Sequence, residues 1–179
     1  MHHTFVDKSG TTLRVRRATE NDAEALLAYV PQIDAESPFT SREAGEFTMS
    51  VAQQRLFLKQ LATRDNSVYF VALDGPLIVA TIDFHGGTRA RGRHAGEFGM
   101  SVRREYWGRG IGTHMLDTML EWARGTGVVR KIKLRVLDTN ERAIALYRSR
   151  GFVEEGRMVR DFRVDGEWHD VLWMGLWLD

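Results

Sequence analysis

The chain has 179 residues, a hydrophobic fraction of 43%, a charged fraction of 27% and a formal net charge of +1. This length suits one domain with its own core, so we expect a single domain over residues 1–179. No apolar run approaches the roughly 20 residues of a membrane span, no basic and apolar leader begins the sequence, and cysteine is absent. We therefore expect a cytoplasmic protein without a membrane partner, disulfides, thiolate metal ligands or a cysteine-bound acyl intermediate.

Apolar periodicity and turn residues predict the elements of the first hundred residues. In chain order they are a strand over 12–17, a helix over 23–30, a surface loop over 34–49, a helix over 51–64, and strands over 68–73, 77–84 and 96–102. Pro31 should end or bend the first helix, because proline lacks the N–H group that continues a helix. Asp74-Gly75-Pro76 is a tight-turn signal, so the strands beside it should form an antiparallel hairpin.

The second half of the chain has a different order of elements. It predicts a glycine-rich turn, a helix over 111–126, a strand over 131–137, a helix over 141–150, and strands over 152–164 and 170–177. This order adds a strand-helix-strand unit to an antiparallel meander. We expect an α+β fold whose central, mostly antiparallel sheet has about seven strands and about four flanking helices.

A glycine-rich segment lies between a predicted strand and a predicted helix. It reads Trp107-Gly108-Arg109-Gly110-Ile111-Gly112-Thr113. Glycines uncover the backbone, and the N–H groups at a helix start bind anions such as a pyrophosphate. We expect Arg103, Arg104 and Arg109 to add charge-assisted bonds at the rim. Such a run alone serves tight strand–helix packing equally well, but its place after several strands does not match a dinucleotide fold, and the lysine of a Walker loop is missing.

Four motifs in a fixed order resemble the GNAT superfamily of acyl-CoA-dependent N-acetyltransferases. They lie at residues 96–102, 106–113, 138–147 and 151–156, and the pattern is most similar to the branch of ribosomal-protein N-terminal and spermidine acetyltransferases. The resemblance implies a splayed sheet in which two parallel strands part. Pantetheine would insert there beside Met100, Ser101 and Val102, and the pyrophosphate would bind at residues 107–113. Trp107 departs from the family pattern, which has Gln or Arg at this position.

The resemblance also implies roles for two residues of the third motif. Asn140 would bind acetyl-CoA near the thioester, and Tyr147 would act as the general acid that protonates the leaving thiolate; core packing is the alternative for Tyr147. A neutral amine is needed for attack on the thioester, so a proton acceptor is required as well. Glu97 is our candidate, because it falls on the strand beside the cofactor in an expected, partly desolvated cleft, where it would act through a bound water. A solvated or salt-bridged position is the alternative.

The function implied is an enzyme that moves an acetyl group from acetyl-CoA directly to a primary amine in a ternary complex. The acceptor would be a protein N-terminus, a polyamine or another small amine. The expected carboxylates of the acceptor pocket are Asp34, Glu36, Glu43, Glu46, Asp161, Asp165, Glu167 and Asp170. The alternative is a catalytically silent acyl-CoA-binding or sensor module.

The sequence predicts neither a metal nor a nucleic acid as a partner, and it leaves a homodimer open. The histidines show no paired ligand spacing, so we expect no metal. The arginine run over 89–93 has no aromatic platform beside it, so we expect no nucleic acid. Trp168, Trp173 and Trp177 make the last strand apolar on both faces, which predicts burial beneath helices and leaves a homodimer contact open.

Overall fold

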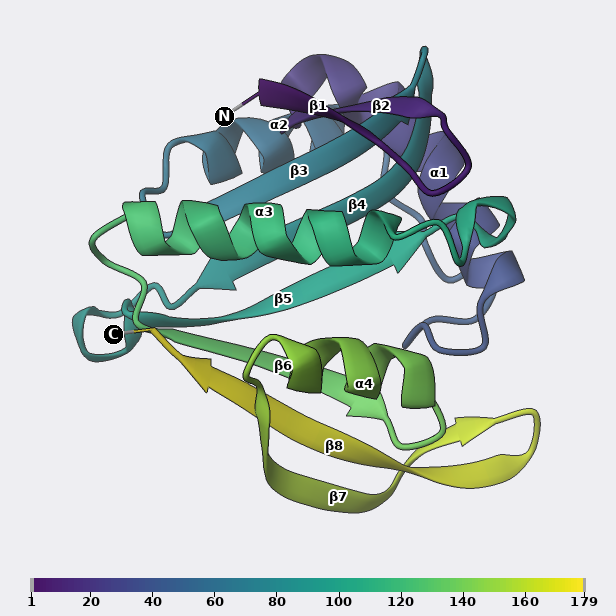
Figure 1. Ribbon diagram of the computed structural model, residues 1–179, viewed down its shortest axis with the longest axis vertical. Helices are drawn as coiled ribbons and strands as arrows, with labels where there is room; N and C mark the ends of the chain where they lie inside the picture. The colour runs from purple at the N-terminus through teal and green to yellow at the C-terminus, as the bar shows by residue number, and fades with distance from the viewer. Residues whose placement is uncertain (1, 179) are drawn as a thin grey trace.

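A computed structural model of the protein describes residues 2–178, whose centre is an eight-stranded sheet in the order β1-β2-β3-β4-β5-β6-β8-β7 (Figure 1). The strands are β1 (His2–Val6), β2 (Thr12–Arg17), β3 (Ser67–Asp74), β4 (Leu77–Gly86), β5 (Ala95–Val102), β6 (Lys131–Leu137), β7 (Val153–Val164) and β8 (Glu167–Trp177). The helices are α1 (Ala23–Glu36), α2 (Val51–Ala62), α3 (Ile111–Gly125) and α4 (Glu141–Ser149). The expected α+β fold with a mostly antiparallel sheet is confirmed.

The sheet has one strand more than the sequence predicts. β1 pairs antiparallel with β2, from His2 opposite Arg16 to Val6 opposite Thr12. Its segment His2-His3-Thr4-Phe5-Val6 lacks the alternation of apolar and polar residues that marks a half-buried strand. It becomes a strand because the free edge of β2 offers backbone partners, a cause that lies outside the segment itself.

The sheet is splayed between β5 and β6, which pair in parallel. Their pairing runs over three residue pairs, from Ala95 opposite Lys131 to Glu97 opposite Lys133. Beyond that point β5 keeps its pairing with β4 as far as Val102, and β6 keeps its pairing with β8 as far as Leu137. Each strand thus stays fixed on its outer side while the inner edges part, which opens the sheet along its middle.

Helices cover both faces of the sheet. Figure 1 shows α3 and α4 in front of the sheet and α1 and α2 behind it. Side chains alternate along β4, so Ile82 and Phe84 lie on the α3 side and join the main core with Met115. The smaller core behind the sheet holds Tyr29 of α1 and Leu58 of α2. The polar residues of β4 therefore face the α1 and α2 side.

Two expectations, about α1 and about the last strand, differ from the structure. α1 continues past Pro31 to Glu36, so of the two alternatives for Pro31 the end of the helix is wrong. Ile33 is buried in the core, and Asp34 is held by a bidentate ion pair from Arg42 at 2.9 and 3.0 Å. On β8, Trp168 and Trp177 are 59% and 57% exposed, so no helix buries them. A homodimer contact through that strand remains a prediction.

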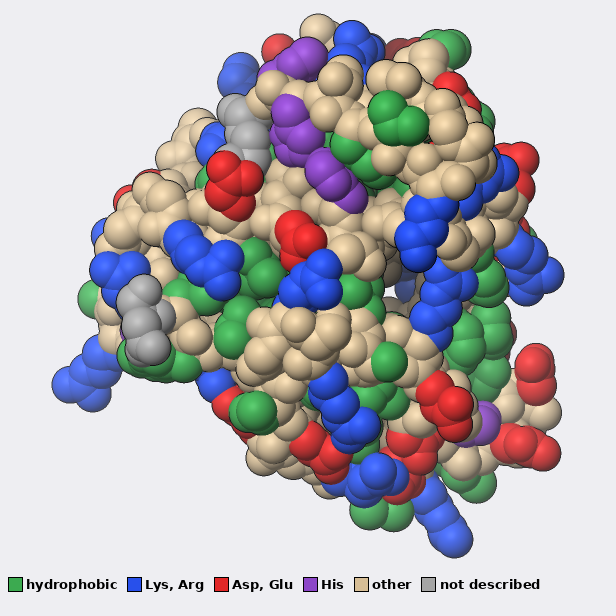
Figure 2. Space-filling view, viewed as in Figure 1, with side chains coloured by type: hydrophobic (Ala, Val, Ile, Leu, Met, Phe, Trp, Pro, Cys, Tyr) green, Lys and Arg blue, Asp and Glu red, His purple; other side chains and the backbone are tan. Residues whose placement is uncertain are grey.

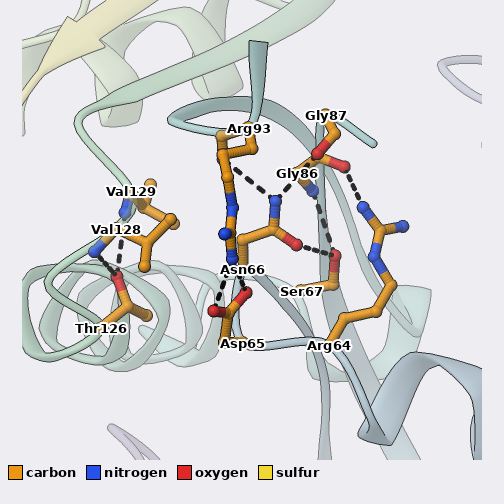
Figure 3. A network of polar contacts seen from close by, with 10 residues as sticks. All are labelled: Arg64, Asp65, Asn66, Ser67, Gly86, Gly87, Arg93, Thr126, Val128 and Val129. Carbon is orange, nitrogen blue, oxygen red and sulfur yellow. Dashed lines mark hydrogen bonds and ion pairs between the residues drawn. The ribbon is translucent and has the colours of Figure 1, made fainter. Parts of the chain in front are cut away.

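A polar network fixes the turn between β4 and β5 (Figure 3). The side-chain N–H groups of Asn66 donate to the carbonyl oxygens of Gly87 and Arg93, both at 3.0 Å. The hydroxyl of Ser67 accepts from Gly86 N–H at 3.2 Å. A Cβ on Gly86 would lie 2.4 Å from Asn66, so only glycine fits there. The network holds the ends of β4 and β5 that carry His85 and Glu97.

Candidate active site

A cavity of about 1090 Å³ occupies the gap where β5 and β6 part. Residues of α1, α2, β4, β5, β6 and the starts of α3 and α4 line it, so it joins both faces of the sheet. Its volume matches that of sites for large ligands. The cavity has two ends, a glycine-rich end at α3 and an aromatic end under α1 and α2.

The glycine-rich loop ends the cavity at the start of α3. Gly108 and Gly110 have φ of +81° and +84°, a conformation that favours glycine, and Gly110 is the N-cap of α3. The first helical hydrogen bond runs from His114 N–H to the Gly110 carbonyl at 3.1 Å. The preceding N–H groups, at residues 111–113, therefore have no intrahelical partner and line the cavity. Together with the positive end of the helix dipole they form an anion site.

The three arginines expected at the rim of this loop are engaged elsewhere. The buried Arg103 donates from Nε to the Ile78 carbonyl at 2.7 Å and bonds Gln32. Arg104 bonds the backbone carbonyl of Glu36 at the end of α1, and Arg109 donates to the Glu105 carbonyl at 2.7 Å. None of the three lines the cavity. Nearby carbonyl and amide oxygens hold their guanidinium groups, and a role of these arginines in binding the cofactor stays a prediction.

Other cations line the cavity instead, among them Lys8, whose segment the sequence did not single out. Lys8 of the β1–β2 turn, Arg142 of α4 and Arg150 line it. The Lys8 N–H group donates to the Arg109 carbonyl at 3.0 Å, which ties that turn to the glycine-rich loop. Figure 2 shows basic side chains beside a hollow at the N-terminal end of α3. Only the tertiary pairing of β1 with β2 brings Lys8 there.

The strand β5 contributes side chains on both sides of the parting. Met100 and Val102 line the cavity next to Gly112, where a Cβ would lie 3.6 Å from the Met100 methyl carbon. Ser101 lies on the other face, and its hydroxyl is 3.0 Å from the Tyr29 hydroxyl. Beyond Glu97 the inner edge of β5 has no pairing with β6, so main-chain groups of this edge are open to a ligand.

Glu97 lines the cavity in a setting that differs from the expected desolvated cleft. Its side chain is 41% exposed, and its carboxylate lies 3.7 Å from Arg135 Nε and 4.0 Å from Lys133 Nζ. Both cations stand on β6, where Lys133 is the residue paired with Glu97. The salt-bridged alternative describes its surroundings, and a role as proton acceptor stays a prediction.

Asn140 and Tyr147 both line the cavity from α4. Asn140 is the N-cap of α4, and its side-chain oxygen accepts from Ala143 N–H at 3.2 Å. Tyr147 is buried edge-to-face against Phe98, with ring centroids 5.6 Å apart. Burial raises the pKa of Tyr147 to about 12. Within residues 2–178 the Tyr147 hydroxyl has no hydrogen-bond partner, although its ring packs in the core. The ring therefore packs in the core, and the role of its hydroxyl as general acid stays a prediction.

The acceptor end of the cavity is aromatic rather than acidic. None of the eight carboxylates expected there lines it, because several are paired elsewhere, such as Asp34 with Arg42 and Asp170 with Arg157. Its walls are instead formed by Tyr29, Phe39, Phe47, Phe57, Tyr69 and Phe162. Asp83 of β4 adds a carboxylate that the sequence did not reveal, because a run of β-forming residues surrounds it.

Two further expectations concern metals and membranes. Across residues 2–178 no three His, Asp or Glu side chains are placed so that they could hold a metal ion. Over the same residues no helix combines the length and the apolarity that crossing a bilayer requires.

The parted strands and the anion loop define a fold class that solved acetyltransferases share. The crystal structure of a GNAT-family acetyltransferase from Streptococcus pneumoniae superposes with a TM-score of 0.90 at 30% identity, covering 93% of this chain and 99% of that one. Residues 32–152 match the family model described as Acetyltransferase (GNAT) family. The chain therefore belongs to the GNAT acetyltransferase family.

Three relatives indicate the range of acceptors within this family. The chain is 33% identical to spermidine N(1)-acetyltransferase of Vibrio cholerae over 42% of the chain and 43% of that enzyme. It is 49% identical to N-alpha-acetyltransferase RimI of Mycobacterium tuberculosis over 34% of the chain and 36% of that enzyme. The match thus spans less than half the length of these two. L-amino acid N-acetyltransferase AaaT of Escherichia coli is 30% identical over 66% of the chain and 74% of that enzyme.

Proposed function

We propose that residues 1–179 form one acetyltransferase domain that moves an acetyl group from acetyl-CoA directly onto a primary amine. The observation that carries this proposal is one cavity that joins the anion loop at α3, the open edge of β5 and the Tyr147 side chain. Family membership supports acetyl-CoA as the donor. The relatives named above act on amines, which supports an amine as acceptor.

Binding of acetyl-CoA follows from the two kinds of free backbone group. The N–H groups of Ile111, Gly112 and Thr113 would take the pyrophosphate, and Lys8 would add a positive charge. The open edge of β5 beside Met100 and Val102 would bond the pantetheine amides much as a sheet strand bonds its neighbour. The thioester would then lie in the gap between β5 and β6.

The reaction joins the amine nitrogen to the thioester carbon and breaks the carbon–sulfur bond. An ammonium ion becomes an amide by losing two protons, of which one ends on the CoA sulfur and one leaves to water. Tyr147 would donate to the sulfur, because its buried phenol stays protonated at neutral pH. Asn140 would hold the donor near the thioester through its side-chain amide, whose oxygen already caps α4.

A carboxylate at the cavity would accept the other proton, and Glu97 is the candidate that the sequence indicates. Positioning of donor and acceptor in one ternary complex would supply much of the rate.

The test is thiol release from acetyl-CoA by the purified protein in the presence of single amines. A panel would hold a polyamine, a peptide with a free N-terminus, an amino acid and simple arylalkylamines. Amine-dependent thiol release supports the proposal. Tight binding of acetyl-CoA without release for every amine would favour the silent binding module.

A further inference from the structure

A polar row crosses the sheet face that α1 and α2 cover. On β4 it contains Asp83 and His85, and on β5 it contains Gly99 opposite Asp83 and Glu97 opposite His85. Residues two apart on a strand share a face, so all four lie on one side of the sheet. The row therefore holds two carboxylates at the cavity, of which the function derived above uses Glu97 alone.

The carboxylate of Asp83 is held on one side and open on the other. Its Oδ2 atom is 2.7 Å from His85 Nε2. Across the strand, a Cβ on Gly99 would lie 3.3 Å from Oδ1, so the missing side chain leaves space above that oxygen. Gly99 follows the last pair of β5 with β6, at Glu97, and thus lies where the strands have begun to part. Asp83 and Gly99 both line the cavity in which a thioester would lie.

The charge environment separates the two carboxylates. Glu97 has a cation of β6 on each side, Lys133 and Arg135. Among the described residues, Asp83 contacts His85 and has no ion pair with lysine or arginine. Tyr69 stands opposite Asp83 on β3, and burial, with a further contribution from the Asp83 charge, raises the pKa of its phenol. Asp83 therefore lines the cavity, and within residues 2–178 no arginine or lysine pairs with its carboxylate in competition with a ligand.

Several aromatic side chains line the cavity end that holds Asp83, beside polar ones such as Thr81 and Ser101. Phe39, Phe47 and Phe57 come from α2 and the loop before it, and Phe162 comes from β7. Arg42 and Arg135 also line the cavity, but each is paired with a carboxylate, Asp34 and Glu97. Asp83, by contrast, has no such cation among the described residues and can bind one ammonium group. A single cation on an apolar body matches such a site, because the rings cover its body and the carboxylate binds its head.

We propose that Asp83 binds the acceptor amine and takes its proton, and that the acceptor carries this amine on an apolar or aromatic body. This inference rests on the proposed function. An ammonium N–H passes its proton to Asp83 Oδ1, and the neutral nitrogen attacks the thioester carbon. As the carbon–sulfur bond breaks, the second amine proton replaces the one that Tyr147 gives to sulfur, and Asp83 returns the first proton to water. Glu97 then remains a salt-bridge partner of β6.

The test compares two amines and three variants by steady-state kinetics. The amines are 2-phenylethylamine, with one ammonium on an aromatic body, and spermidine, with several ammonium groups. The variants are Asp83→Asn, Glu97→Gln and, as a matched control, Asp161→Asn on the exposed part of β7, which does not line the cavity. Calorimetry with acetyl-CoA reports for each variant whether the donor site is intact.

The expected result is a higher kcat/KM of the wild-type protein for 2-phenylethylamine than for spermidine. Asp83→Asn should lower kcat/KM for 2-phenylethylamine about 100-fold, the usual effect of losing a general base. Glu97→Gln should have a smaller effect, Asp161→Asn none, and acetyl-CoA affinity should stay unchanged in all three. Gly99→Ala gives a second measure, because its methyl group would cover Oδ1 and raise KM for the amine.

Several outcomes would overturn the inference and can be told apart. If Asp83→Asn and Gly99→Ala keep wild-type kinetics while Glu97→Gln loses activity, the proton acceptor is Glu97. If spermidine is the better substrate of the wild-type protein, the acceptor class is wrong. A wild-type protein that acetylates neither amine but others in the panel contradicts the acceptor class alone, whereas one that acetylates no amine contradicts the proposed function itself.

Discussion

Glu97 and Lys133 form the last residue pair between the parallel strands β5 and β6, and their side chains meet at 4.0 Å. From this pair onward the inner edges of the two strands face a cavity rather than each other. The site is therefore located by the point at which sheet pairing stops. The carboxylate of Glu97 marks this point, and the cations of β6 keep it beside the opening.

The left-handed conformation of Gly110 predicts that even a methyl group there will weaken acetyl-CoA binding. Gly110→Ala keeps ordinary contact distances to Lys8, but at φ of +84° it introduces strain of about 1–3 kcal/mol. Relief of this strain would turn the N–H groups of the loop, so the dissociation constant for acetyl-CoA should rise about tenfold. Calorimetry measures it. Gly92→Ala is the control, since a Cβ at Gly92 meets open space at an ordinary φ; equal affinities of the two variants would contradict the role of the loop.

Lys8, rather than the arginines near the loop, should contribute to acetyl-CoA affinity. Lys8→Gln removes a cation that lines the cavity, whereas Arg104→Gln removes one that is bound to the end of α1. We expect a several-fold loss of affinity in the first variant, with a steeper dependence on salt in the wild-type protein, and little change in the second. Titration of both variants at low and moderate ionic strength decides between them. A larger loss of affinity in Arg104→Gln than in Lys8→Gln would show that the arginines near the loop bind acetyl-CoA.

Tyr147→Phe should lower kcat and leave acetyl-CoA affinity intact. The change removes one hydroxyl from a ring whose packing against Phe98 it retains, so a loss of about 100-fold would report proton donation. Because burial raises the pKa of Tyr147 to about 12, the phenol stays protonated, and wild-type kcat should show no alkaline fall due to this group up to about pH 10. A Tyr147→Phe variant with wild-type kcat would leave Tyr147 a packing residue only.

Protonation of His114 should lower the stability of the protein in mild acid. It stacks on Phe5 with ring centroids 3.7 Å apart, and its Nε2 atom is 2.8 Å from that of His3. Burial, with the His3 charge as a smaller cause, lowers the pKa of His114 below its ordinary value near 6.5. Below that value the unfolded chain binds more protons than the folded one, so the free energy of unfolding falls as pH drops.

Urea unfolding at pH 7.5 and pH 5.5 measures this effect. His114→Phe should show a smaller difference between the two pH values than the wild-type protein does. An equal difference in both proteins would assign the acid sensitivity to other groups.

Local signals in the sequence predicted much of the fold and the glycine end of the site. The loop depends on the positive φ of Gly110 and on the missing side chain of Gly112, and both features belong to glycine itself. The strand β6 was predicted with its observed bounds, Lys131–Leu137. The strand β1 was missed because its pairing with β2, and not its own pattern, makes it a strand. Side-chain partners were predicted least well. Arg104 bonds Glu36, which lies 68 residues away in the chain, and no spacing rule reveals such a contact.

The acceptor end shows the same limit. Asp83 lies within a run of β-forming residues, and its exposure to the cavity depends on Gly99 standing opposite it in the sheet register. The sequence does not reveal that register, and the family resemblance predicts instead an acceptor wall of carboxylates from the first two helices, their connecting loop and the last hairpin. In the structure, aromatic side chains from α2, its preceding loop and β7 line this end of the cavity.

The most direct test of the account follows the acetyl group itself. The purified protein is incubated with acetyl-CoA alone and then with acetyl-CoA and an amine, and mass spectrometry follows the protein, the amine and free CoA. Direct transfer predicts an unmodified protein in both cases and, with the amine, one N-acetylamine for each CoA released. An acetylated protein that later passes its acetyl group to the amine, or CoA release without any acetylated amine, would contradict direct transfer.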